Sequence, residues 1–299
     1  METSIKSLAE KLSSYDKWHK FMLVIPLIIM LISLVYIGYF FSKNGDIMHK
    51  DVSLSGGTTI TLKGDVDTNI IESSLKSRFP DISIRKLTEI GTGEHIASII
   101  ESSAQPQELK EGIESALGYN LTDENSSTEF TGSALSENFY KQLILTLLIS
   151  FILMSLVIFI LFKSFIPSIA VIFAAFSDIV MPLALIDFMG INLSAAGIAA
   201  FLMLIGYSVD TDILLTTRAL KKREGFLNER IYGAFKTGIL MTLTALFTVL
   251  PAFFIITGLP DSFRQIFLIL SLGLFADIIN TWLTNASIIK WYCDKKGIK

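Results

Sequence analysis

The segment Phe21–Phe41, FMLVIPLIIMLISLVYIGYFF, decides the fold class, because its 21 residues contain no charge. A helix needs about 20 apolar residues to cross a bilayer. Gln142–Phe162, QLILTLLISFILMSLVIFILF, is a second uncharged stretch of the same length. The sequence therefore predicts an α-helical integral membrane protein.

The composition of the whole chain supports this class. Of its 299 residues, 51% are hydrophobic and 18% are charged, whereas about 25% are charged in a typical soluble domain. Such a composition excludes a disordered chain, and a net charge of −3 gives no reason to expect a nucleic-acid partner. Cys293 is the single cysteine, so neither an internal disulfide nor a cysteine-based metal cluster can form.

Four further apolar stretches complete a set of six predicted spans, one before the polar block 42–141 and five in a bundle formed by residues 142–290. The apolar run of the first span is too long for a signal peptide and lacks a small-residue cleavage site, so we expect an uncleaved anchor. The predicted spans are 21–41, 142–162, 165–186, 191–215, 237–257 and 263–289.

Lys and Arg residues in the short segments predict the orientation, since cytoplasmic loops carry an excess of both. The short segments on the opposite side offer only Arg264. We therefore expect a multi-pass protein of the cytoplasmic membrane, with the tails 1–20 and 291–299 in the cytoplasm and residues 42–141 outside. The basic residues on the predicted cytoplasmic side are Lys6, Lys11, Lys17, Lys20, Lys163, Arg218, Lys221, Lys222, Arg223, Arg230, Lys236, Lys290, Lys295, Lys296 and Lys299.

Residues 42–141 form an acidic block with 9 Lys and Arg against 16 Asp and Glu. Alternating and helical hydrophobic patterns within it give the order β-α-β-β-α-β, which predicts a small α+β ferredoxin-like domain. Asn120 and Asn125 begin glycosylation sequons, without deciding whether either is modified. The expected strands are 58–62, 82–90, 95–101 and 128–131, and the expected helices are 68–79 and 106–117.

Four carboxylates, Asp178, Asp210, Asp212 and Asp277, fall within the predicted spans. On insertion scales, a charged residue at a helix centre costs about 2.5–3.5 kcal/mol. A carboxylate in a low-dielectric environment favours its protonated form, and such residues mark proton or cation paths in membranes. We therefore predict a proton relay that involves these four residues.

Asp210 and Asp212 are expected to differ in role, because positions two apart on a helix lie roughly 200° from each other. One would face a proton path, and the other a neighbouring helix or the cytoplasmic rim, where Asp212 could already reach interfacial water. A purely structural role is the alternative for the whole set. Polar partners for such a role are present at Ser177, Ser208, Thr242, Thr244 and Asn280.

Small residues between Ala195 and Gly206 predict a close packing surface on the fourth span. We therefore expect this span to be central in the bundle. No G-x-x-x-x-G-K-[ST] motif occurs, and no His, Cys and acidic residues have the spacing of metal ligands. The sequence thus predicts no cofactor, no metal and no enzymatic activity, and leaves the proton-motive force as the source of work.

The sequence Gly206-Tyr207-Ser208-Val209-Asp210-Thr211-Asp212, which runs into Arg218, resembles the fourth-span signature of SecF in the SecD/SecF family of protein-export membrane proteins. Leu54-Ser55-Gly56-Gly57 is similar to the F-x-G-G motif of this family, with Leu in place of Phe. Asp178 matches the third-span Asp. The resemblance extends over nearly the whole chain, because residues 275–286 are similar to the sixth span of archaeal members and the layout of spans agrees.

The resemblance implies a function. Members of this family act with SecD, a related protein of the same layout, in a twelve-span complex of the resistance-nodulation-division superfamily. That complex assists translocation of polypeptides through a SecY-type channel, and protons are thought to drive it. Asp210 stands where SecD-type sequences have their Asp, so the resemblance favours Asp210 as the proton carrier.

This chain also departs from the bacterial pattern. Asp210-Thr211-Asp212 replaces Asn-Asp-Thr, and Lys236 is the basic residue nearest to the Arg that bacterial members have in span five. Lys236 and Arg218 are therefore the candidate positive partners. Two other functions stay open: a binding or assembly module of the translocon without proton coupling, and one half of a small-molecule exporter.

Overall fold

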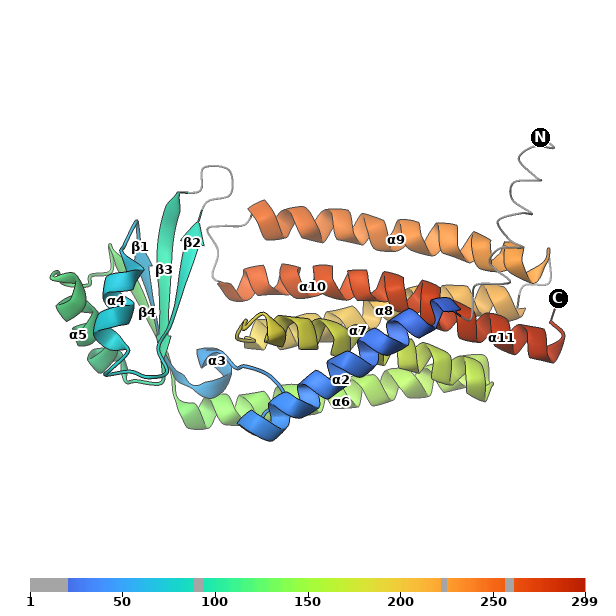
Figure 1. The fold of residues 1–299 in the computed structure, drawn as a ribbon, viewed down its shortest axis with the longest axis horizontal. Coiled ribbons are helices and arrows are strands. Elements are labelled where there is room, and N and C mark those ends of the chain that lie inside the picture. Colours follow the sequence, from blue (N-terminus) through green and yellow to red (C-terminus); the bar gives the residue numbers. More distant parts are fainter. Residues whose placement is uncertain (1–20, 89–93, 222–224, 256–260, 299) are drawn as a thin grey trace.

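The computed structural model describes residues 21–88, 94–221, 225–255 and 261–298. It consists of a bundle of long helices with a small sheet domain at one end (Figure 1). We call the end of the bundle next to the sheet domain the outer end and the opposite end, where α11 finishes, the inner end.

Within the described ranges, six helical stretches are long and apolar enough to cross a membrane, as the sequence predicts. The first five are α2 (Val24–Asn44), α6 (Ser133–Phe162), α7 (Phe165–Phe188), α8 (Ala195–Lys221) and α9 (Leu227–Ile255). The sixth consists of α10 (Asp261–Ile279), a π-helical turn η1 (Asn280–Asn285) and α11 (Ala286–Lys296).

Several of these helices extend past the predicted spans. The α6 helix begins at Ser133 instead of residue 142, and α8 continues to Lys221 instead of residue 215. Hydropathy marks only the part of a helix that contacts lipid, whereas backbone hydrogen bonding continues through polar turns. One such turn lies near the start of α6, where Lys141 Nζ lies 2.7 Å from Glu137 Oε1. The π-helical turn in the sixth span is likewise invisible to hydropathy.

The sheet domain has the predicted β-α-β-β-α-β order. Its strands are β1 (Gly57–Lys63), β2 (Ser83–Thr88), β3 (His95–Ser102) and β4 (Ser126–Thr131), and its helices are α4 (Thr68–Leu75) and α5 (Pro106–Leu117). The spatial order is β2-β3-β1-β4 and every pair is antiparallel. This topology confirms the ferredoxin-like expectation.

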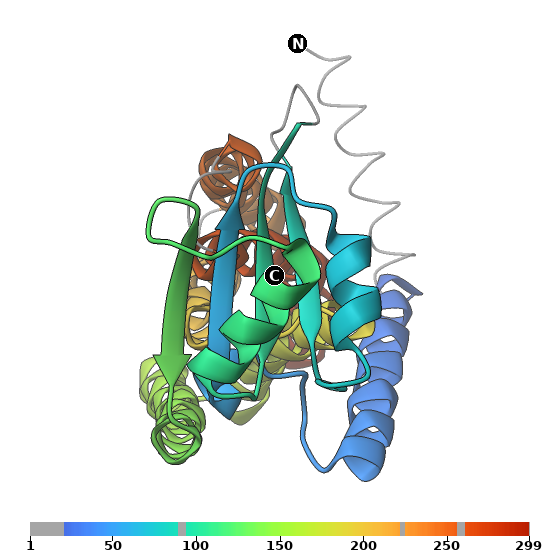
Figure 2. The same cartoon turned by 90° about the vertical axis from the view of Figure 1, so that its left-hand side faces the viewer.

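Both helices of the domain cover one face of the sheet (Figure 2). Ile60 and Ile100 face each other across the two central strands and are fully buried. They pack with Ile71 of α4 and with Leu109 and Ile113 of α5. The alternation of apolar residues along β1 and β3 thus determines which face the helices cover.

The α8 helix is central in the bundle and contacts α6, α7, α9 and α10. Its close packing requires small residues, since a Cβ atom on Gly197 would collide with Gln265 and Ile269 of α10. One face of α8 is nevertheless not covered by the other described helices. Met203, Gly206, Tyr207 and Asp210 lie on this face and are exposed.

Candidate functional site

Three of the four predicted carboxylates meet in the middle of the bundle. Asp178 comes from α7, Asp212 from α8 and Asp277 from α10. Each side chain is at most 1% exposed. We call these three residues the carboxylate cluster.

Asp178 is held by one residue of α8 and one of η1. The Ser208 hydroxyl donates to Asp178 Oδ2, and Asn280 Nδ2 donates to Asp178 Oδ1 at 2.6 Å. Each carboxylate oxygen of Asp178 therefore accepts a hydrogen bond, and both donors are uncharged.

The Thr281 hydroxyl joins the other two carboxylates. Its Oγ1 lies 2.9 Å from Asp212 Oδ1 and 2.9 Å from Asp277 Oδ1. A hydroxyl has one hydrogen to donate, so Thr281 can donate to only one of the two carboxylates at a time. A proton on the other carboxylate allows that group to donate to the Thr281 oxygen, and the three side chains then form a continuous hydrogen-bonded path.

Further hydroxyl and amide groups complete the cluster. Thr211 Oγ1 lies 3.0 Å from Asp277 Oδ1 and 2.8 Å from the Ser208 carbonyl oxygen, so it too must choose between acceptors. Thr242 Oγ1 of α9 lies 3.2 Å from Asp277 Oδ2 and 3.2 Å from the Gly238 carbonyl oxygen, so it also has two acceptors for one hydrogen. Asn285 Nδ2 donates to Asp212 Oδ1 at 2.7 Å, whereas Asp212 Oδ2 is buried with no partner among the described residues.

The two aspartates of α8 do face different sides, as their spacing predicts, but the structure assigns them differently from the favoured interpretation. Asp210 is exposed and lies outside the cluster, while Asp212 is fully buried within it. The expectation that Asp212 reaches interfacial water is wrong. It lies nine residues before the end of α8 at Lys221, about 13 Å along the helix, and η1 covers it.

Neither candidate positive partner pairs with a carboxylate of the cluster. Arg218 Nη1 donates to the Gly233 carbonyl oxygen of α9 at 2.6 Å. Lys236 Nζ lies over the Tyr232 ring, 4.8 Å from its centroid. The ion pairs formed by the described residues include none with Asp178, Asp212 or Asp277.

Three residues that contact the cluster are assigned no role by the sequence patterns: Thr211, Thr281 and Asn285. Thr281 follows Asp277 by four residues, a spacing that places both on one face of a helix, so the sequence did contain an indication of it. The sequence contains no such indication for Asn285, because its side chain reaches Asp212 only when residues 280–285 form a π-helical turn. Of the predicted structural partners, Ser208, Thr242 and Asn280 contact the cluster, whereas Ser177 and Thr244 bond to backbone carbonyls of their own helices.

The chemistry of the cluster follows from its charges. Asp178, Asp212 and Asp277 act on one another electrostatically, and neighbouring carboxylates in a low dielectric cannot all be ionised without a compensating cation. No group of three or more His, Cys, Asp and Glu suited to a metal ion occurs within the described residues. Protonation of one or more carboxylates relieves the repulsion, and the Thr281 hydroxyl lies between two of them.

The chain is similar in sequence to known membrane proteins. Residues 114–295 match the family model described as protein export membrane protein SecD/SecF, C-terminal. The chain is 35% identical to protein-export membrane protein SecF of Methanolacinia petrolearia over 280 residues, which cover 93% of this chain and 95% of that one. It is 36% identical over 281 residues to the SecF of Methanocaldococcus jannaschii, covering 92% and 96% of the two chains.

A solved structure shares the fold. The translocon-associated membrane protein SecDF of Thermus thermophilus superposes with a TM-score of 0.73 at 17% identity, over 93% of this chain and 38% of that longer one. A second structure, SecDF in a super-membrane-facing form, gives a TM-score of 0.59 at 19% identity. The likeness covers the bundle and the sheet domain together.

Proposed function

This chain belongs to the SecD/SecF family of protein-export membrane proteins, and from this premise we propose that it promotes protein translocation across the cytoplasmic membrane as a proton-driven accessory subunit. It acts with a SecD partner on polypeptides that emerge from a SecY-type channel. It does so as a transport component and not as a catalyst. Protonation of the carboxylate cluster supplies the coupling step.

The observation that carries this proposal is the Thr281 hydroxyl shared by Asp212 and Asp277. Both carboxylate oxygens lie 2.9 Å from one hydroxyl oxygen. Transfer of a proton between the carboxylates reverses the direction in which Thr281 donates and alters the contact between α8 and the sixth span. The cluster therefore links a change of protonation to a change of helix packing.

The exposed face of α8 supports a SecD partner. Asp210 lies on this face with Met203, Gly206 and Tyr207, between the ends of a membrane-spanning helix. A charged side chain in contact with lipid is costly, and small residues favour close helix contact. A second helical bundle that packs against this face would cover Asp210.

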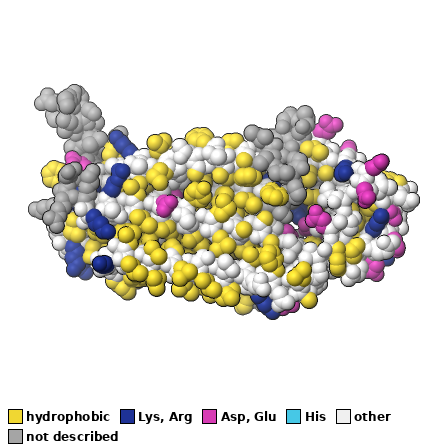
Figure 3. Space-filling view, turned by 180° about the vertical axis from the view of Figure 1, so that it is seen from behind, with side chains coloured by type: hydrophobic (Ala, Val, Ile, Leu, Met, Phe, Trp, Pro, Cys, Tyr) yellow, Lys and Arg dark blue, Asp and Glu magenta, His cyan; other side chains and the backbone are white. Residues whose placement is uncertain are grey.

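The distribution of charge supports the proposed orientation. Lys and Arg side chains gather at the inner end of the bundle and most acidic ones at the sheet domain (Figure 3). An excess of Lys and Arg marks the cytoplasmic side. The inner end is thus cytoplasmic and the sheet domain extracytoplasmic, where it can hold emerging chains.

Substitution of Asp212 tests the coupling. We expect Asp212→Asn to abolish the stimulation of polypeptide translocation by a proton gradient in vesicles that contain the complex with SecD and the channel. Asn cannot exchange a proton with Thr281 and Asp277. Asp294→Asn is the matched control, because Asp294 is exposed at the inner end, and the gradient should stimulate this variant as it does the unaltered protein.

Two outcomes would contradict the proposal in different ways. An undiminished response to the gradient in Asp212→Asn would exclude the cluster as the coupling site. Translocation that does not change when the gradient is collapsed, but is lost without residues 42–141, would instead favour a binding module without proton coupling.

A further inference from the structure

The segment 46–57, which we call the outer clamp, connects the outer end of the bundle to the sheet domain. It runs from the end of α2 through the short helix α3 (Val52–Ser55) to the first residue of β1. It contains the Leu54-Ser55-Gly56-Gly57 motif. Within the described residues, none of its hydrogen bonds or ion pairs is made to a residue of the carboxylate cluster.

Asp187 attaches the clamp to α7. The backbone N–H of His49 donates to Asp187 Oδ1 at 2.7 Å, and His49 Nδ1 lies 2.7 Å from the same oxygen. Tyr36 of α2 donates to Asp187 Oδ2 at 3.0 Å. Asp187 is 2% exposed, so a buried carboxylate near the outer end of α7 holds both the clamp and α2.

Backbone hydrogen bonds and a side-chain cap attach the clamp to α8. Leu193 donates to the His49 carbonyl oxygen at 2.7 Å, and Asp51 donates to the Leu193 carbonyl oxygen at 3.0 Å. The backbone N–H of Ala195, the first residue of α8, donates to Ser53 Oγ at 3.0 Å. Ser53 thereby satisfies a donor at the start of α8 that has no partner within the helix itself.

The clamp also reaches α10 through the loop between α7 and α8. Gln265 of α10 accepts hydrogen bonds from the backbone and hydroxyl of Ser194 at 2.7 and 2.6 Å. Its Nε2 donates to the Asn192 carbonyl oxygen at 2.7 Å. The three helices that bear the carboxylate cluster are therefore joined at their outer ends to the clamp or to the loop it binds.

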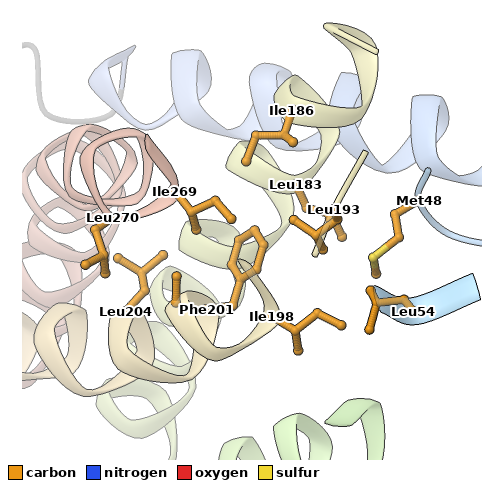
Figure 4. Close-up of a cluster of buried hydrophobic side chains, with 11 residues drawn as sticks. Met48, Leu54, Leu183, Ile186, Leu193, Ile198, Phe201, Leu204, Ile269 and Leu270 are labelled. Carbon is orange, nitrogen blue, oxygen red and sulfur yellow. The ribbon is translucent and has the colours of Figure 1, made fainter. Parts of the chain in front are cut away.

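Apolar side chains anchor the clamp in the bundle. Met48 and Leu54 are 5% and 1% exposed and lie against a cluster that includes Leu193, Ile198 and Leu183 (Figure 4). Burial of these two side chains removes apolar surface from water and so favours the attached position of the clamp. The clamp is thus part of the core of the bundle and not a loose linker.

Two glycines fasten the other side of the clamp. A Cβ atom on Gly56 would collide with Ser133 at the start of α6, and one on Gly57 would collide with Ser102 at the end of β3. Both residues have positive φ, 83° and 134°, a region that side chains disfavour. The backbone of the clamp thus contacts α6 and the central strand β3 directly.

Charged groups brace the clamp from within. Burial by itself would raise the pKa of Asp46. Hydrogen bonds from Lys50 and from Tyr140 of α6 have the larger effect, so the pKa of Asp46 is lowered. Asp51 caps α3 by accepting from the Ser53 N–H at 2.9 Å, although its burial raises the pKa of Asp51. An ionised Asp46 thereby ties the start of the clamp to α6.

We propose that the outer clamp is a rigid coupler, which transmits displacements of α7 and α8 at the carboxylate cluster to the sheet domain. This role rests on the proposed proton coupling, since protonation supplies the displacement. A flexible linker would let the helices move without the domain. The clamp instead shares backbone hydrogen bonds with the α7–α8 loop and close glycine contacts with α6 and β3.

Spin-label distances in the full chain together with its SecD partner test the proposal. One label pair at Glu111→Cys and Phe247→Cys reports on the domain relative to α9. A second pair at Ile169→Cys and Leu240→Cys reports on the bundle. All four sites are exposed, whereas the native Cys293 is buried. Asp212→Asn represents the protonated state.

Two serines of α3 provide a matched comparison. Ser53→Ala removes the hydroxyl that accepts from the Ala195 N–H of α8 and donates to Asp51 Oδ1, whereas Ser55→Ala removes hydroxyl contacts only to the backbone of Asp51 and Gly56. We expect Asp212→Asn to shift both distances in the unaltered clamp and in Ser55→Ala. In Ser53→Ala the bundle distance should still shift, and the shift of the domain distance should be lost. Asp187→Asn, which keeps the size of the side chain, should behave as Ser53→Ala does.

The two label pairs separate the possible failures. A domain shift that persists in both Ser53→Ala and Asp187→Asn would overturn the clamp alone. If Asp212→Asn shifts neither distance in the unaltered clamp, the proposed function fails, and the role of the clamp fails with it.

Discussion

At the scale of single residues, Thr281 separates this cluster from a set of independent buried acids. Its hydroxyl lies between Asp212 and Asp277 and can serve only one of them as a donor. A purely structural partner has one acceptor and one fixed orientation. The Thr281 hydroxyl has two equidistant acceptors, so the protonation of the carboxylates decides its orientation.

Substitution of Thr281 should reveal this dependence. In Thr281→Val, the single donor that two buried carboxylates share is lost, which costs about 1–3 kcal/mol of stability, and we expect the response of translocation to a proton gradient to be lost. Thr281→Ser keeps the hydroxyl and should retain the response. Thr248→Val is the control, because Thr248 is exposed and its hydroxyl bonds to the Thr244 carbonyl oxygen. A normal gradient response in Thr281→Val would refute the role of the hydroxyl.

At the scale of elements, the π-helical turn η1 assembles the site. Within η1 hydrogen bonds run from residue i to i+5, as from Ala286 back to Thr281. This widening brings residues five apart toward the same side of the helix. Asn280 and Asn285 can therefore bind Asp178 and Asp212 from one turn.

The packing of α9 against η1 should be sensitive to volume. A Cβ atom on Gly238 would meet the indole ring of Trp282, so we expect Gly238→Ala to lower stability by about 1–3 kcal/mol through overpacking. Gly233→Ala is the control on the same helix, because its Cβ would meet only Arg218 Nη1 at an ordinary 3.6 Å. Thermal unfolding followed by tryptophan fluorescence in one detergent compares the two. Equal stability would show that α9 and η1 can separate without cost.

At the scale of the whole molecule, one exposed face of α8 differs from the rest of the surface of the bundle. Most of the chain's exposed apolar side chains lie on the membrane-spanning helices, where contact with lipid favours them. The α8 face is different, since Asp210 and Gly206 are exposed there on the most central helix of the bundle. A helix that packs against four other spans and still presents a carboxylate outward is suited to a further protein surface.

Enlarging Gly206 should weaken association without affecting the chain itself. No atom lies within 4 Å of a Cβ placed on Gly206, so Gly206→Leu should leave the unfolding temperature of the isolated chain unchanged. Its binding to SecD should become roughly tenfold weaker, because overpacking at a close helix contact costs about 1–3 kcal/mol. Gly38→Leu on α2 has equally open space and should leave co-purification with SecD unchanged. Equal recovery of SecD with both variants would exclude this face as the interface.

By itself, the sequence determined the membrane class, the six spans, the β-α-β-β-α-β order of the sheet domain, and the presence of unusual carboxylates. These properties follow from composition and from short-range periodicity. Only the tertiary structure decided which aspartate of α8 joins Asp178 and Asp277, because a 200° separation divides two residues without saying which one faces the core. It also placed Thr281 and Asn285 at the cluster and Leu54 in the core of the bundle. These contacts depend on helix rotation and on a π-helical turn, and neither is encoded in the hydropathy of one segment.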